Sequence, residues 1–186
     1  MKNLKQNIYL IGPMGSGKTT IGRQLAKMFD LEFYDCDHEL ERLTGASVSL
    51  IFDLEGESGF RLREHHLLEQ LTAKNGVLIA TGGGIVCKEE NRRLLRSHGL
   101  VVYLKTSIDN QLKRLQKDKS RPLLQAADRV QRLKDLAEVR NPLYDVTADL
   151  VFTTRNSSVY ATAKALSNAI SERLDMLSQE QSHAER

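Results

Sequence analysis

The stretch of sequence that decides the fold is Gly12-Pro13-Met14-Gly15-Ser16-Gly17-Lys18-Thr19. It matches the complete phosphate-loop (Walker A) pattern, in which spaced glycines precede a lysine and a hydroxyl residue. An apolar run comes before it and an amphipathic helical pattern follows, as a strand and a helix would. The glycines let successive N–H groups point at phosphate oxygens, and the helix adds the positive end of its dipole. The stretch therefore predicts a site for the phosphates of a nucleotide.

Two side chains of this loop have predicted roles of their own. Lys18 reaches the β- and γ-phosphates, and the Thr19 hydroxyl is a ligand for Mg²⁺. The alternative interpretation is a glycine-rich turn that happens to precede a lysine. The loop does not identify the reaction, because kinases, GTPases and motors share it. The predicted nucleotide-binding residues are Gly15, Ser16, Gly17, Lys18, Thr19 and Thr20.

Five short apolar runs are dense rather than alternating, as expected of parallel strands covered on both faces. Helical patterns separate them, and the clearest is the last, which begins at Val159 and still shows an apolar face at Leu177. Strands alternating with helices predict an α/β fold, a parallel sheet flanked by helices. We expect strands at residues 8–11, 31–34, 77–80, 100–104 and 150–152.

A length of 186 residues fits one domain. We predict a single domain over residues 1–178, with two departures from simple alternation. Residues 37–75 are too many for one crossover helix, so several helices should form there. Residues 114–126 are charged and resemble a mobile lid. Residues 179–186 lack an apolar face and are predicted to form a flexible polar tail.

Composition excludes several classes of protein. The net charge of +3 is too small to argue for nucleic acid, and no apolar run approaches the roughly 18 residues of a membrane span. The two cysteines, Cys36 and Cys87, form neither a disulfide framework nor a metal-ligand spacing, and we expect both to be reduced. We therefore predict a cytoplasmic protein, and we expect a monomer.

Two carboxylates, Asp35 and Asp37, follow the second predicted strand. Residues two apart on a strand share a face, and the carboxyl ends of parallel strands are where such sheets bind ligands. Asp35 is the candidate support for Mg²⁺, through its water shell. Asp37 is the candidate acceptor of a proton from an attacking hydroxyl. The alternative for Asp37 is a helix N-cap, and one residue can do both.

The third predicted strand ends in Thr81-Gly82-Gly83-Gly84, where GTPases and motors often place an aspartate. Bare backbone lets a ligand approach closely, and glycine N–H groups bind oxygen atoms. A tight strand-to-helix turn is the alternative, although it rarely needs three glycines. Gly82, Gly83 and Gly84 are therefore predicted to bind substrate.

Two arginines are candidates for binding an anion. Arg61 precedes Glu64 by three residues, so a helical pair would orient its guanidinium. Arg140 lies on a largely apolar stripe, and a buried arginine needs an ionised partner. An internal salt bridge is the alternative. The stripe consists of Val130, Leu133, Ala137, Arg140 and Tyr144.

A basic cluster, Arg114, Lys117, Lys119 and Arg121, occupies the lid-like segment. Pro122 stiffens the chain behind Arg121. An arginine held there would neutralise charge on a transferred phosphoryl group, so Arg121 is a catalytic candidate with Lys18 and Asp37. A solvated charged loop is the alternative for its lysines.

Several motifs, in order from Asn7 to about Ile170, resemble the shikimate kinase family. They are the phosphate loop, Phe33-Tyr34-Asp35-Cys36-Asp37, Phe60-Arg61-Leu62-Arg63-Glu64, Thr81-Gly82-Gly83-Gly84, Arg121-Pro122-Leu123-Leu124 and Arg140-Asn141-Pro142-Leu143-Tyr144.

The resemblance implies five parallel strands in the order 2-3-1-4-5, a mobile lid, and transfer of the ATP γ-phosphate to the 3-hydroxyl of shikimate, with Mg²⁺, in aromatic amino-acid biosynthesis. It implies that Asp37 binds the substrate hydroxyls and acts as base, and that Arg61 and Arg140 grip the carboxylate. It places Arg114 against adenine and Arg121 over the phosphates. Phe52 and Phe60 would line the ring, and the Gly83 N–H would bind the substrate.

Two alternatives stay open. A gluconate-type sugar-acid kinase would use a related fold and also needs an arginine for a carboxylate. A nucleotide-dependent switch without turnover would need loops that respond to the γ-phosphate. It would need neither the paired aspartates nor a buried arginine.

Overall fold

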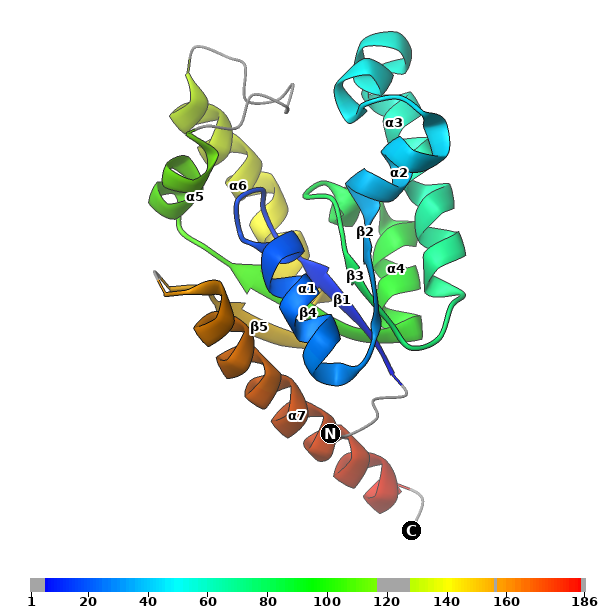
Figure 1. Cartoon of the computed structure of the whole chain (residues 1–186), viewed down its shortest axis with the longest axis vertical. Coiled ribbons are helices and arrows are strands. Elements are labelled where there is room, and N and C mark those ends of the chain that lie inside the picture. Colours follow the sequence, from blue (N-terminus) through cyan, green and yellow to red (C-terminus); the bar gives the residue numbers. More distant parts are fainter. Residues whose placement is uncertain (1–5, 117–127, 156, 185–186) are drawn as a thin grey trace.

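The computed structural model describes residues 6–116, 128–155 and 157–184, and its centre is a five-stranded sheet (Figure 1). The strands follow the order β2-β3-β1-β4-β5, and every pair is parallel. The predicted α/β class and strand order are therefore confirmed. The strands are β1 (Asn7–Ile11), β2 (Glu32–Asp35), β3 (Val77–Ala80), β4 (Gly99–Lys105) and β5 (Leu150–Thr153).

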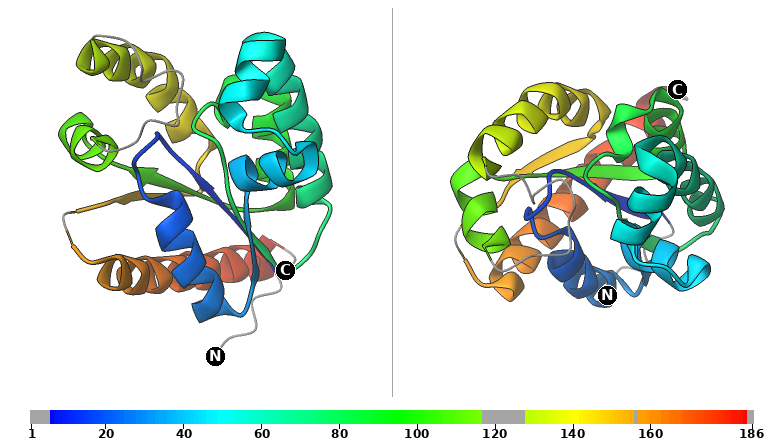
Figure 2. Two further views of the ribbon diagram at one scale, coloured as in Figure 1. Left: turned by 45° about the horizontal axis from the view of Figure 1, so that its top comes forward. Right: turned by 90° about the horizontal axis from the view of Figure 1, so that it is seen from above.

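Helices cover both faces of the sheet (Figure 2). Strand β1 shows the alternation: Ile8 and Leu10 pack with α1 and α7, whereas Tyr9 and Ile11 pack with α3, α4 and α6. A sheet buried on both faces explains the dense apolar runs. The helices are α1 (Lys18–Phe29), α2 (Cys36–Thr44), α3 (Val48–Thr72), α4 (Glu89–His98), α5 (Ile108–Leu115), α6 (Arg129–Thr147) and α7 (Val159–Ala184), with the 3-10 turn η1 (Ile85–Cys87).

The region predicted to form several helices, 37–75, contains α2 and α3. Helix α3 is interrupted at Gly56, whose φ of 70° and ψ of −176° are not helical. The two helices rise beside the carboxyl end of β2, at the upper right of Figure 1. Within the described ranges, no helix combines the length and apolar character that crossing a bilayer requires.

The end of the chain differs from its prediction. Instead of a flexible tail from residue 179, helix α7 continues to Ala184. Glutamine and glutamate are good helix formers, and no glycine or proline stops the helix after Leu177. An exposed ion pair between Arg173 and Glu180, at 3.9 Å, spans this last part.

The predicted lid lies mostly outside the described residues, and so does Arg121. Its two flanking helices, α5 and α6, are described. They meet over the phosphate loop in an apolar cluster of Met14, Leu115 and Leu133. Val130, at the start of α6, is exposed, so the apolar stripe of that helix begins at Leu133.

Candidate active site

The phosphate loop has the geometry that its glycines predict. Gly15 and Gly17 have φ values of 75° and 95°, in the left-handed region where side chains are disfavoured. Gly17 is also the N-cap of α1, so the loop leads directly into the positive end of that helix. The Lys18 Nζ is buried and donates to the carbonyl oxygens of Gly12 (2.7 Å) and Pro13 (2.9 Å). The loop is therefore wrapped around its own lysine.

Thr19 and Asp35 come together, as a metal site requires. The Thr19 hydroxyl donates to Asp35 Oδ2 at 2.6 Å. Hydroxyl and carboxylate oxygens suit Mg²⁺, which keeps several waters and needs few protein ligands. Accordingly, the described residues contain no cage of three or more His, Cys, Asp or Glu side chains. The donor set fits Mg²⁺ bound beside nucleotide phosphates.

Asp35, rather than Asp37, caps helix α2. Its Oδ1 accepts from the N–H groups of Asp37 (3.1 Å) and His38 (3.3 Å). The strand ends at Asp35 and the helix begins at Cys36, so the two aspartates are not on one strand as predicted. The cap interpretation of Asp37 was therefore wrong. Asp37 lies in the first turn of α2.

Asp37 is shared by two adjoining pockets. One pocket holds it with Lys18 and Thr19, at the phosphate loop. The other holds it with Arg61 and Arg140. A group bound in the second pocket would therefore lie beside the phosphates, with a carboxylate between them. This arrangement suits transfer of a phosphoryl group to a hydroxyl.

The second pocket combines an apolar wall with charged groups and spans about 490 Å³ of empty space, part of it open to solvent. The rings of Phe52 and Phe60 form the wall, with centroids 4.5 Å apart. Both aromatic residues therefore line the same pocket. The lining residues are Met14, Asp37, Val48, Phe52, Phe60, Arg61, Glu64, Gly82, Gly83, Gly84 and Arg140.

The predicted pair of Arg61 and Glu64 forms. Arg61 Nη1 lies 2.7 Å from Glu64 Oε2, and the two side chains are 19% and 2% exposed. Burial raises the pKa of Glu64, and the charge of Arg61 opposes that rise. The other oxygen, Oε1, has no hydrogen-bond partner in the part of the chain that is described. Sequence reasoning treated Glu64 as a support for Arg61 and missed its place in the pocket wall.

Close packing explains two of the three glycines. A methyl group at position 82 would lie 2.5 Å from Glu64 Oε1, and one at position 84 would lie 2.1 Å from Arg61 Nη2. The first and third glycines therefore make room for the charged pair. At Gly83 the nearest atom would be 3.5 Å away, which is ordinary contact. Gly83 is thus the glycine of the turn that has space around it.

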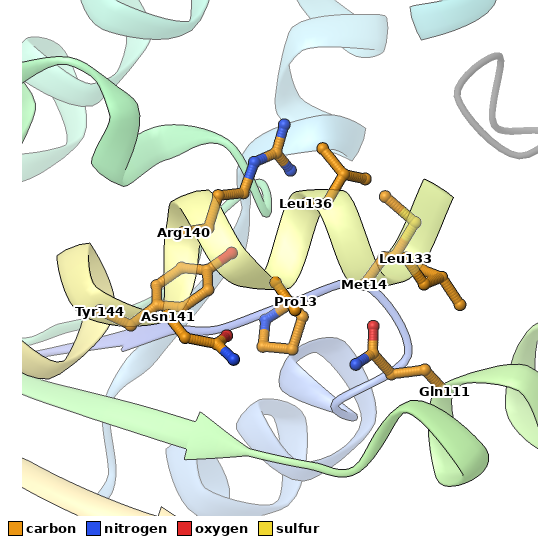
Figure 3. A pocket seen from close by; sticks show the side chains of 9 residues that line it. Pro13, Met14, Gln111, Leu133, Leu136, Arg140, Asn141 and Tyr144 are labelled. Atoms are coloured by element: carbon orange, nitrogen blue, oxygen red, sulfur yellow. The ribbon is translucent and has the colours of Figure 1, made fainter. Parts of the chain in front are cut away.

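Arg140 lies on the opposite wall, on α6. It is 7% exposed, and its Nη1 would lie 3.8 Å from a methyl group at Gly83. Figure 3 shows it beside Tyr144, whose hydroxyl is on the side of the ring nearest Arg140. The Tyr144 hydroxyl donates to the Gly83 carbonyl. Sequence reasoning placed Tyr144 on the apolar stripe but missed its polar contact, because periodicity reports burial and not hydrogen bonding.

The remaining predicted residues lie at the nucleotide side. Arg114 Nη1 donates to the Gly15 carbonyl at 2.9 Å, so it adjoins the phosphate loop. The exposed Thr20 hydroxyl donates to the Gly17 carbonyl at 3.2 Å. Ser16 Oγ is buried without a hydrogen-bond partner in the described ranges.

Comparisons with known proteins agree on one family. The family model described as shikimate kinase matches residues 14–173. The chain is 49% identical to the shikimate kinase of Mannheimia succiniciproducens over 172 residues, 92% of this chain and 96% of that one. It is 53% identical to shikimate kinase 1 of Hamiltonella defensa over 163 residues, 87% and 94% of the two chains. The structure of shikimate kinase from Acinetobacter baumannii in complex with shikimate is 45% identical, with a TM-score of 0.89, over 91% of this chain and 95% of that one.

Proposed function

The chain belongs to the shikimate kinase family, and from this premise we propose that it transfers the γ-phosphoryl group of ATP to the 3-hydroxyl of shikimate. The observation that carries the proposal is the position of Asp37, which lines both the phosphate pocket and the pocket with the two arginines. The reaction belongs to aromatic amino-acid biosynthesis.

Asp37 is the group that orients the acceptor. The hydroxyl oxygen of the substrate attacks the γ-phosphorus while the bond to the β,γ-bridging oxygen breaks and ADP leaves. The hydroxyl proton passes to the Asp37 carboxylate. Lys18 neutralises the phosphate oxygens from the other side, and catalysis of this kind rests mainly on positioning and charge.

Arg61 and Arg140 form the proposed clamp for the substrate carboxylate. They enter the pocket from different helices, α3 and α6, so a carboxylate between them meets two guanidinium groups. Arginine suits this task because its planar fork binds a carboxylate in two places. Glu64 holds Arg61 in position, and Gly82, Gly83 and Gly84 supply backbone against the substrate.

Thr19 and Asp35 would hold Mg²⁺, which neutralises phosphate charge when it is bound. Kinases that use ATP generally need such a divalent cation. The proposed roles of Arg114 against adenine and of Arg121 over the phosphates follow from the family resemblance. The cytoplasmic location and the monomeric state also stay predictions.

The test is release of ADP by the purified chain with ATP and Mg²⁺, supplied with shikimate, gluconate or no acid. We expect turnover when shikimate is supplied, and none with gluconate or without an acid. Turnover with gluconate and not with shikimate would favour a sugar-acid kinase. Slow hydrolysis that neither acid changes would favour a nucleotide-dependent switch.

Lys18→Met tests the phosphate loop in the same assay. The change removes the cation and keeps most of the apolar length, so we expect kcat to fall by about 10³-fold or more while the fold is kept. Lys27→Met, on an exposed position of the same helix, is the control. A folded Lys18→Met variant with near-normal turnover would contradict the assignment of the phosphate loop.

A further inference from the structure

The carbonyl groups of the glycine turn are bound in two different ways. Those of Gly82 and Gly84 accept from nearby backbone, the N–H groups of Ile85 (3.2 Å) and Cys87 (3.0 Å). The carbonyl of Gly83 accepts instead from the Tyr144 hydroxyl on α6, 61 residues away. The middle of the turn is thus tied to a distant helix.

The same hydroxyl also lies beside Arg140 (Figure 3). Burial raises the pKa of Tyr144, and the nearby positive charge of Arg140 opposes that rise. Tyr144 therefore stays protonated and able to donate to Gly83. Its ring is fully buried and packs against Tyr103, with centroids 4.9 Å apart, so the hydroxyl has a fixed place.

We propose that Tyr144 is a positioning residue whose hydroxyl bridges the Gly83 carbonyl and the Arg140 guanidinium, and so holds two walls of the substrate pocket in register. The proposal rests on the proposed function, in which these groups bind shikimate. Arg140 and Gly83 line the pocket together, and a methyl group at Gly83 would lie 3.8 Å from Arg140 Nη1.

Two physical reasons make such a bridge effective. The Gly83 carbonyl and the Gly84 N–H belong to one planar peptide unit, so the bond from Tyr144 orients both in a turn whose glycines are otherwise free to rotate. Arginine has a long side chain that loses much rotamer freedom when it is held. The charge of Arg140 also opposes the rise in the pKa of Glu64, so the Glu64 carboxylate attracts the guanidinium as well. A hydroxyl that holds it at Gly83 lowers the cost of ordering it when the substrate binds.

Tyr144→Phe removes the bridge and keeps the ring. We expect KM for shikimate to rise about tenfold, the order expected when one partner of a buried hydrogen bond is removed. KM for ATP, and ATP affinity without shikimate, should stay at the wild-type value. The matched control is Tyr103→Phe, which removes the neighbouring buried hydroxyl, bonded to Asn141 Oδ1 at 3.3 Å. It should leave both KM values unchanged.

Several outcomes would overturn the proposal. The first is an unchanged KM for shikimate in Tyr144→Phe. The second is an equal loss of affinity for ATP and for shikimate, because that would indicate a general structural role. If Tyr144→Phe does not fold, 4-aminophenylalanine at this position restores a donor. It should then keep most of the shikimate affinity, and failure to do so contradicts the role of the donor.

A double-mutant cycle tests the link to Arg140. If the hydroxyl acts through Arg140, Tyr144→Phe should weaken shikimate binding less in an Arg140→Lys background than in wild type. Additive losses would contradict the bridge. Turnover of the wild-type chain with shikimate is measured first. Its absence would overturn the proposed function, whereas normal wild-type turnover with an inert Tyr144→Phe change overturns the bridge alone.

Discussion

Asp37 shows how one side chain can serve two pockets without being needed for the helix that carries it. Because Asp35 accepts the first free N–H groups of α2, the cap does not depend on the residue at 37. The structure therefore separates the structural role from the chemical one. This separation makes the charge of Asp37 testable on its own.

Asp37→Asn should lower kcat by about 10²-fold or more, because an amide cannot accept the hydroxyl proton. Thermal stability should change little, since Asp35 remains as the cap. Steady-state kinetics and a melting curve are the measurements. Asp53→Asn, an exposed aspartate on α3, is the control, and an unchanged kcat in Asp37→Asn would end the proposal that it acts as base.

Gly84 is required because it has no side chain. Alanine there would place its methyl group 2.1 Å from Arg61 Nη2, which is too close for any contact. We expect Gly84→Ala to displace Arg61 and raise KM for shikimate by about tenfold or more, as loss of an interaction with a charged group would. ATP affinity, measured by titration without shikimate, should be unaffected. Normal shikimate kinetics would show that Arg61 does not bind in its observed position.

At the scale of single elements, helix α3 carries much of the substrate pocket. Phe60, Arg61 and Glu64 lie within about one turn, so the apolar wall, the cation and its partner move as a unit. The break at Gly56 separates this turn from the start of the helix, where Phe52 completes the aromatic wall. A kinked helix thus lets two aromatic rings face each other from one element.

Helix α7 has a buried part and a part that projects (Figure 1). Ala163, Leu166 and Ile170 are buried against α1 and the sheet, and Leu174 and Leu177 are partly buried. Further along, Glu180 pairs with Arg173 at 3.9 Å, and ion pairs near the surface contribute little.

Deleting residues 179–186 should therefore change the free energy of unfolding by less than about 1 kcal/mol and leave kcat unchanged. Leu166→Ala, which opens a cavity under the same helix, should cost about 2–5 kcal/mol. Urea unfolding of both variants makes the comparison. A large loss on truncation would mean that the end of α7 contributes substantially to the stability of the fold.

At the scale of the whole molecule, the parallel sheet brings the site together. The phosphate loop, the two aspartates and the glycine turn lie at the carboxyl ends of β1, β2 and β3, which are adjacent strands, so all three meet at one edge of the sheet. Arg140 comes from α6 on one face of the sheet and completes the pocket. Binding of the acid thus depends on packing between elements that are distant in the chain.

Arg140→Ala should weaken shikimate binding by about 2–5 kcal/mol, the range for removing one partner of a buried charged pair. ATP binding without shikimate should change little, because Arg140 does not line the pocket at the phosphate loop. Calorimetry with each ligand separates the two effects, with Arg132→Ala, exposed on the same helix, as the control. If the variant binds shikimate normally, the carboxylate clamp is wrong.

Some properties of this protein follow from sequence alone because they depend on short stretches. The phosphate loop is a contiguous pattern, and dense apolar runs identify strands that must be buried on both faces. The Arg61–Glu64 pair and the burial of Arg140 follow from helical spacing, since residues three or four apart share a face. These features predicted the fold class and most of the site residues.

Other properties were decided only in the tertiary structure. Asp35 became the cap because helix α2 begins directly after the strand, at Cys36, which leaves Asp37 inside the first turn. Glu64 against Gly82, and Tyr144 against the Gly83 carbonyl, are contacts between residues 18 and 61 positions apart in the sequence. Periodicity predicts which side of a helix is buried. It does not predict which atoms the buried side chains contact, because those contacts depend on how the helices pack on the two faces of the sheet. For this reason the sequence indicated the residues of the site, and packing decided how they are held.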